Sequence, residues 1–197
     1  MAIDVQQNNP HWNFLLALDA DLSQLSRYVE FDSRNFDSFS LELARLLLSA
    51  GSEVDVVAKQ LCRALAANSK AESINSYRDE ICKTYPQIPN FQVISPRFSL
   101  TLQPWDEWRK KSGVPFWWTA YNKVKHERHA HYDRANLKNA LNAVAGLLVL
   151  VLFLYRQEAT EGLLVPSPQI LRVHDKHVTG FTAGEYYQGV WYKLDDR

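Results

Sequence analysis

The chain has 197 residues, which is long enough for one large domain with a substantial core. Its 22 basic and 22 acidic residues give a formal net charge of +0, so no whole-molecule field attracts nucleic acid or an anionic membrane. Any such binding requires a local patch. With 12% aromatic residues and 7 glycines, the composition excludes a low-complexity chain and favours a packed globular protein.

The cysteines, the N-terminal residues and the apolar run bear on the cellular compartment of the protein. Cys62 and Cys82 stand in segments with helical spacing and form no Cys-x-x-Cys pair, so we expect buried free thiols. Residues 1–10 have neither a basic leader nor an apolar signal core. The apolar run at 143–155 is shorter than the roughly 20 residues that a membrane span requires. We therefore expect a cytoplasmic protein without a membrane segment.

The first half of the chain has the three- and four-residue apolar spacing of amphipathic helices. This spacing predicts a first helix at about 11–31 and a second that begins near Phe39. Gly51 stands where a left-handed cap would end the second helix, and Ser52 where an N-cap would begin a third. So short a turn makes antiparallel neighbours, which predicts an up-down bundle.

A fourth helix is expected at 71–84, because prolines follow it at 86 and 89. From Phe91 to Leu102 the period changes to two, with Ser95-Pro96 as a turn, which predicts a short hairpin.

Beyond residue 161, extended pieces at 170–173, 177–181 and 186–192 suggest short strands or an arm that pairs with that hairpin. The expected fold is mainly α, an antiparallel helical bundle with a short β-hairpin and a C-terminal extended segment. The domain prediction is a helical bundle at 1–160, with the hairpin inserted at about 91–103, and an appendage at 161–197.

Two further helices follow the hairpin. Pro115 suits the first position of a helix that continues to about Arg128. Asp133 is expected to cap the next helix, which would start at Arg134 and continue to about Glu158. That last helix is apolar on all sides in its second half. Such a helix is enclosed by its own domain or shared with a second copy.

The segment at 116–132 is the one place where polar chemistry adjoins the core. On a helix, Asn122, His126 and His129 form one ridge, and Tyr121, Lys125 and Arg128 form the ridge beside it. The inward positions are Trp117, Ala120, Tyr121 and Val124. The segment therefore predicts a polar, cationic strip on an anchored helix.

The run Tyr121-Asn122-Lys123-Val124-Lys125-His126, followed by a long apolar helix, resembles the HEPN superfamily. The signature of that family is an Arg, usually followed by a polar residue, with His four to six positions on. Asn122 and His126 match it, and Tyr121 stands where the family has Arg. The resemblance covers roughly residues 11–158 and its motif is short.

The resemblance implies a helical bundle that dimerises and, in many members, a metal-independent RNA endonuclease of toxin or antiphage systems, with no cofactor. A homodimer, RNA and an antitoxin or other protein are the implied partners. His126 would exchange protons with the 2′-hydroxyl or the leaving oxygen, since histidine is the side chain type suited to proton exchange near neutrality. Asn122 and Tyr121 complete the expected catalytic set. The expected substrate-binding residues are Lys123, Lys125, Arg128 and His129.

Other interpretations stand beside this one. The same strip would also serve a noncatalytic dimeric module that binds RNA, a nucleotide or a protein. Alternatively, Tyr121, Asn122 and His126 form a buried hydrogen-bonded cluster with function elsewhere. Trp117 and Trp118 are more typical of a core than of base stacking. His126, His129 and His131 do not converge as a tetrahedral zinc site requires, so we expect no metal.

The local excess of positive charge suits phosphate binding, and it is equally typical of a solvated surface. The cations concerned are Arg109, Lys110, Lys111, Lys123, Lys125, Arg128, Arg134 and Lys138.

Overall fold

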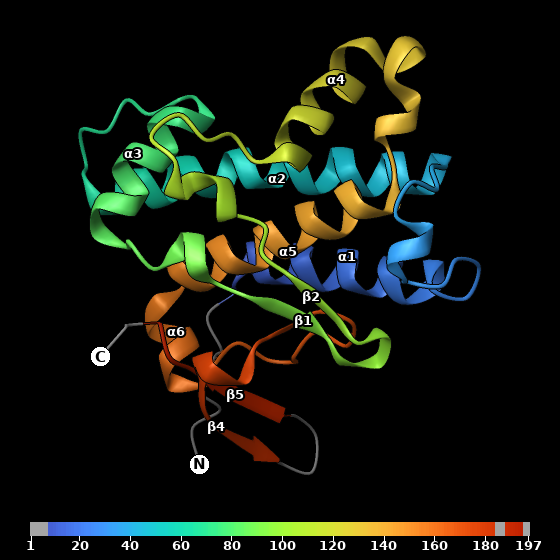
Figure 1. Ribbon diagram of the computed structural model, residues 1–197. Coiled ribbons are helices and arrows are strands. Elements are labelled where there is room, and N and C mark those ends of the chain that lie inside the picture. The colour runs from blue at the N-terminus through green and yellow to red at the C-terminus, as the bar shows by residue number, and fades with distance from the viewer. Residues whose placement is uncertain (1–7, 184–187, 195–197) are drawn as a thin grey trace.

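The computed structural model describes residues 8–183 and 188–194, and within them the protein is mainly helical with two small antiparallel sheets (Figure 1). The α-helices are α1 (Pro10–Leu25), α2 (Leu41–Leu65), α3 (Ile74–Thr84), α4 (Phe116–His131), α5 (Leu137–Leu154) and α6 (Arg156–Glu161). The strands are β1 (Val93–Ser95), β2 (Leu100–Leu102), β3 (Arg172–Val173), β4 (Val178–Ala183) and β5 (Gln188–Tyr192).

Helix α5 is the centre of the molecule. It crosses the middle of Figure 1 between α1 and α2, with α4 above it and the β1–β2 hairpin below. Every residue from Leu137 to Phe153 except Lys138 is buried. By length and composition the helix could cross a membrane, but 89% of that window lies inside the protein, as in the core helix of a soluble protein. The prediction of an enclosed helix is confirmed, and its own chain encloses it.

Helix α2 corrects the prediction of two helices joined at Gly51. It begins after Ser40, whose hydroxyl accepts a hydrogen bond from the Leu43 N–H at 3.2 Å, and continues unbroken through Gly51 to Leu65. Ser52 is therefore an exposed interior residue rather than an N-cap. The glycine does not end a helix here. It is buried against the side chain of Tyr121, which occupies the space that a Cβ would need.

The helix directions also differ from an up-down bundle. The Leu137 N–H at the start of α5 donates to the Ser38 carbonyl at 3.0 Å, so α2 and α5 begin side by side and run in the same direction. Helix α1 is antiparallel to α2. His11 near its start bonds Glu53 at 2.5 Å, and Asp21 further on pairs with Arg45 at 2.9 Å. The antiparallel pair predicted around Gly51 is therefore absent, because both predicted helices belong to α2, while α1 is antiparallel to α2 and α5 is parallel to it.

The boundaries of α4 and α5 also differ from the predicted ones. Pro115 is the residue before α4 rather than its first position. Asn136, not Asp133, caps α5, with its side-chain oxygen accepting the Asn139 N–H at 3.0 Å. Residues Tyr132–Arg134 form a 3-10 turn instead, and α5 ends at Leu154. The backbone bond from Leu137 to Ser38 fixes where α5 starts, and the sequence of 132–137 alone does not contain that contact.

The hairpin and the C-terminal segment form one sheet. Strand β1 pairs antiparallel with β2, placing Val93 opposite Leu102, and on its other edge with β3, placing Val93 opposite Val173. The predicted hairpin, and its pairing with the C-terminal segment, are confirmed. Strands β4 and β5 pair with each other. Residues 186 and 187 of the expected strand at 186–192, and Met1–Gln7 of the N-terminal segment, lie outside the described residues.

A buried carboxylate attaches the C-terminal segment to α1. Asp19 is 2% exposed and accepts backbone N–H bonds from Gln169 at 2.5 Å, Ile170 at 3.1 Å and Leu171 at 2.9 Å. Hydrogen bonds to an ionised acceptor are the stronger kind, and an unpaired buried N–H is costly. Asp19 therefore fixes the chain that leads into β3.

Replacing this carboxylate tests its contribution. Asp19→Ala leaves three N–H groups without their acceptor, and we expect the free energy of unfolding to fall by about 3 kcal/mol. Urea titration followed by circular dichroism measures it. Asp21→Asn is the matched control, because its partner Arg45 is largely solvated and the loss should stay below about 1 kcal/mol. Equal losses in the two variants would contradict the assignment.

Candidate functional site

The aromatic side of α4 is fixed in the core. Trp117 is 0% exposed and its indole N–H donates to the Pro104 carbonyl at 2.8 Å, while Trp118 is 7% exposed. A Cβ on Gly146 of α5 would lie 2.9 Å from Trp117 Cζ2, so the two helices approach closely only because that residue is glycine. Both tryptophans are core residues, as the sequence favoured, and neither is placed to stack on a base.

Tyr121 and Asn122, both predicted to be catalytic, lie on α4 before the residues that line its open cleft, and neither of them lines it. Tyr121 is 4% exposed, with its ring against Gly51 of α2 and the Lys125 ammonium 5.5 Å from the ring centroid. The half-buried Asn122 donates its amide N–H to the Trp118 carbonyl at 3.1 Å. Tyr121 is thus placed to support Lys125 rather than to meet a ligand directly.

The outward side of α4 borders an open cleft of about 760 Å³, which we call the α4 cleft. His126, Lys125, Arg128 and His129 are all exposed and all line it. The remaining wall residues are Leu41, Leu48, Val124 and Tyr132. Four of the residues predicted from the sequence therefore meet in one place, with apolar side chains of α2 beside them. Leu41 and Leu48 were missed, because nothing local connects α2 to α4.

Helix α4 changes direction inside this site. Glu127 has non-helical backbone angles, φ −138° and ψ 45°, one residue before the predicted end of the helix. A further helical turn follows, in which His131 pairs with Glu127 at 3.4 Å. The α4 cleft is therefore built from both sides of the kink, with His126 before it and His129 after it.

A second pocket lies where α4 meets the start of α5, and we call it the basic pocket. Its volume is about 290 Å³, and its lining includes the cations Lys123, Arg134 and Lys138 and one carboxylate, Asp37. Arg134 also pairs with Asp133, outside the lining, at 3.5 Å. The other lining residues are Phe116, Thr119, Ala120, Asn136 and Asn139. Three cations around one cavity favour an anion such as phosphate. Lys123, predicted to bind substrate, belongs to this pocket and not to the α4 cleft.

Side chains, not the helix terminus, would hold that anion. The first N–H groups of α5 already have acceptors in the protein. Leu137 donates to Ser38 at 3.0 Å, Lys138 to Phe36 at 3.2 Å and Asn139 to the Asn136 side chain at 3.0 Å. The Lys138 ammonium lies 4.9 Å from the Phe116 ring centroid, which directs it across the pocket.

Among the described residues, no cluster of side chains has the arrangement of a metal site, and the two cysteines have raised pKa values. No group of three or more His, Cys, Asp or Glu side chains in 8–183 or 188–194 is arranged to hold a metal ion. Burial raises the pKa of the Cys62 thiol to about 12 and that of Cys82 to about 11, so both stay protonated near neutrality. A protonated thiol is a poor nucleophile.

No family model, curated protein or solved structure matches this chain. The function is therefore inferred from the residues of the α4 cleft and of the basic pocket.

The contact between Gly51 and Tyr121, which seats α4, is open to a direct test. Gly51→Ala adds helix propensity of about 1 kcal/mol, but its methyl group must displace a buried ring. We expect a net loss of unfolding free energy of about 1–3 kcal/mol in denaturant titration. Ser52→Ala, on the exposed side of the same helix, should be neutral or slightly stabilising. If both variants gained stability, the close contact would be refuted.

Proposed function

We propose that this protein is a HEPN-like, metal-independent RNA endonuclease of the cytoplasm, acting as a toxin or antiphage effector. The observation that carries the proposal is the position of His126. It is exposed on the wall of the α4 cleft, beside Lys125 and near Arg128 and His129. An exposed imidazole with cations beside it suits proton transfer at a phosphodiester.

The proposed reaction is attack of a ribose 2′-hydroxyl on the adjacent phosphorus. The 2′-oxygen bonds to phosphorus, the bond to the 5′-oxygen breaks, and a 2′,3′-cyclic phosphate and a 5′-hydroxyl result. One proton leaves the 2′-hydroxyl and one reaches the 5′-oxygen, and His126 carries one of these transfers. Lys125 and Arg128 stabilise the negative charge that develops on the phosphoryl oxygens.

Tyr121 occupies the place of the family's Arg, and the charge that Arg would supply must come from elsewhere. We assign it to Lys125, whose ammonium lies over the Tyr121 ring at 5.5 Å from the centroid. Tyr121 then acts as a positioning residue for that cation. Asn122, with its amide bonded to Trp118, has an orienting part in the turn that carries His126.

The basic pocket extends the proposed binding surface. Lys123 lies on α4 within one turn of His126, and Arg134 and Lys138 line the same pocket. We propose that these three cations hold phosphates that flank the cleaved bond. Since the protein has no net charge, this local excess would supply the attraction for RNA.

We further propose a homodimer that pairs two α4 clefts. Leu41, the first residue of α2, is 65% exposed and lines the cleft, and Phe39, which precedes the helix, is 51% exposed. The Phe39 ring contacts the Tyr132 ring edge-on, at 5.4 Å between centroids. Exposed apolar side chains that adjoin a polar site are typical of a surface covered by a partner. An antitoxin bound here would block the same site.

The catalytic proposal predicts that His126→Ala abolishes cleavage of a single-stranded RNA. Removal of a general acid or base typically lowers the rate about 100- to 10,000-fold. The measurement is single-turnover cleavage of an end-labelled RNA in the presence of EDTA. His131→Ala is the control, because His131 lies on the same helix in the turn after the kink, pairs with Glu127 and does not line the cleft. It should cleave at the wild-type rate.

The same RNA distinguishes the noncatalytic alternative, which the cations of the cleft also favour. A salt-sensitive complex that Lys125→Ala or Arg128→Ala weakens, and that never turns over, would replace the nuclease with a binding module. RNA that is neither bound nor cut by the wild-type protein would remove both proposals.

The dimer predicts that Leu41→Lys yields a monomer. An ammonium at this position would be desolvated in the interface beside the like charges of Lys125 and Arg128, which costs several kcal/mol. Sedimentation over a range of concentrations measures the change. Val56→Lys is the control, because Val56 is 40% exposed on the same helix but does not line the α4 cleft. A wild-type protein that stays monomeric at all concentrations would refute the dimer.

A further inference from the structure

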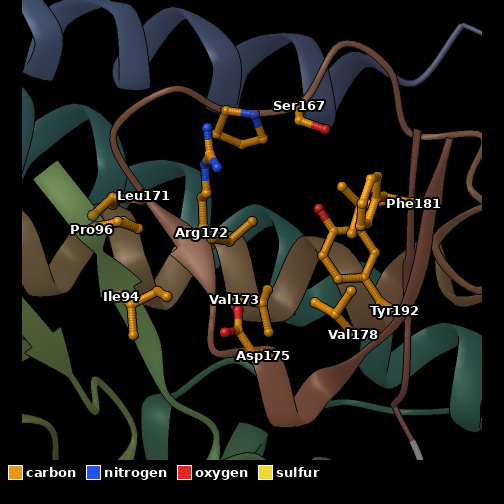
Figure 2. A pocket seen from close by; sticks show the side chains of 13 residues that line it. Ile94, Pro96, Ser167, Leu171, Arg172, Val173, Asp175, Val178, Phe181 and Tyr192 are labelled. Atoms are coloured by element: carbon orange, nitrogen blue, oxygen red, sulfur yellow. The ribbon is translucent and has the colours of Figure 1, made fainter. Parts of the chain in front are cut away.

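A third cavity lies far from α4, between the β2-β1-β3 sheet and the β4–β5 hairpin. In Figure 1, α4 stands at the top of the molecule and this hairpin at the bottom. The cavity, shown from close by in Figure 2, has a volume of about 340 Å³. We call it the C-terminal pocket. Its residues take no part in the α4 cleft or in the basic pocket.

The walls of the C-terminal pocket are mostly apolar and come from many elements. Strand β1 contributes Ile94, β3 contributes Val173, β4 contributes Val178, and α5 contributes Leu148. Other apolar lining residues are Pro96, Pro168, Leu171, Phe181, Val190 and Tyr192. Phe181 is 75% exposed, so one side of the apolar lining reaches solvent. Concave sites with apolar walls and a few polar groups are typical of small-molecule binding.

Arg172 supplies the positive charge at the mouth of the pocket. It is an exposed residue of β3, and Figure 2 shows its side chain directed towards the segment that carries Ser167. Among residues 8–183 and 188–194, no carboxylate lies within ion-pair distance of its guanidinium and no group accepts a hydrogen bond from it. A guanidinium beside an apolar cavity, whose donors meet no acceptor among the described residues, is suited to a carboxylate.

Tyr192 adds a polar group inside the wall. It is 5% exposed, and Figure 2 shows its hydroxyl on the side of the pocket towards which Arg172 extends. Burial raises the pKa of Tyr192 to about 12, against an opposing effect of the Arg172 charge. The hydroxyl therefore stays protonated near neutrality and can donate a hydrogen bond to an anion.

Asp175 sets the orientation of a charged ligand. It lies on the opposite side of the pocket from the Arg172 guanidinium in Figure 2, and it is exposed. An anionic head group is repelled from Asp175 and attracted to Arg172, so the two charges select one end of the pocket.

We propose that the C-terminal pocket binds a small amphipathic anion, with a carboxylate held by Arg172 and the Tyr192 hydroxyl and a short apolar body between the two sheets. The size of the cavity limits that body. At about 340 Å³ it lies near the lower end of the roughly 300–1,000 Å³ range of ligand sites. A medium-chain fatty acid fits this chemistry, whereas a nucleotide would leave most of its polar groups without partners.

Three ligands of one chain length test the proposal by calorimetry on the full-length protein. Octanoate should bind saturably at one site with a Kd of about 1 mM or tighter, and octylammonium at least about tenfold more weakly. Octanol has the same chain length but no charge, and it serves as the uncharged comparison. Because ligand binds only the folded state, octanoate should also raise the Tm.

Two variants and a control locate the site. Arg172→Gln should weaken octanoate binding about tenfold or more while leaving octanol unchanged, since a charged hydrogen bond is lost. Lys193→Gln removes an exposed cation that does not line the pocket, so it should change the affinity for neither octanoate nor octanol. Val178→Trp fills the cavity and should abolish binding of octanoate and octanol. If Val178→Trp misfolds, Arg172→Gln still tests the proposal, because Arg172 lies on the surface.

Other results would overturn the proposal. These are no saturation by octanoate up to about 10 mM, equal affinity for octanoate and octylammonium, or equal loss in Arg172→Gln and Lys193→Gln. None of these results bears on RNA cleavage at His126, so the two proposals fail independently.

Discussion

The close approach of α4 to α2 and α5 at two glycines is the constraint on which the proposed site depends. The Tyr121 ring fills the space beside Gly51, and the Trp117 ring fills the space beside Gly146. Because interiors are close-packed, two rings held in this way leave α4 one position and one rotation. The polar residues on its other side are therefore displayed from a rigid support, which is what a site requires of its scaffold.

The same constraint explains the main error of the sequence-based prediction. Gly51 followed by Ser52 matches the end of one helix and the start of another, so local pattern favoured a break. The actual reason for glycine is a ring 70 positions further along the chain, and no local pattern contains it. Asp19 is similar, since the N–H groups that it accepts lie about 150 residues away. By contrast, α5 is apolar on all sides, and that pattern alone predicts an enclosed helix.

In the candidate site, too, the features that depend on neighbouring residues in the sequence were predictable, and those that depend on distant residues were not. Lys125, His126, Arg128 and His129 follow one another on one helix, so helical geometry was enough to group them. The inward position of Tyr121 was also predictable from helical geometry, but its contact with Gly51 and the apolar wall from Leu41 were not, because both depend on α2. The basic pocket falls between these cases. Its cations at Lys123, Arg134 and Lys138 were visible as an excess of charge, but their convergence depends on where α5 begins.

Helix α5 also separates the two regions for which we propose ligands. Gly146 contacts Trp117 of α4, whereas Leu148 lines the C-terminal pocket. Two residues apart on a helix means roughly 200° of rotation, so these positions lie on opposite sides of α5. Coupling between the regions would require α5 itself to take two arrangements. Since nearly every residue of α5 is buried in close packing, such a shift would disturb the whole core, and we infer that the two regions act independently.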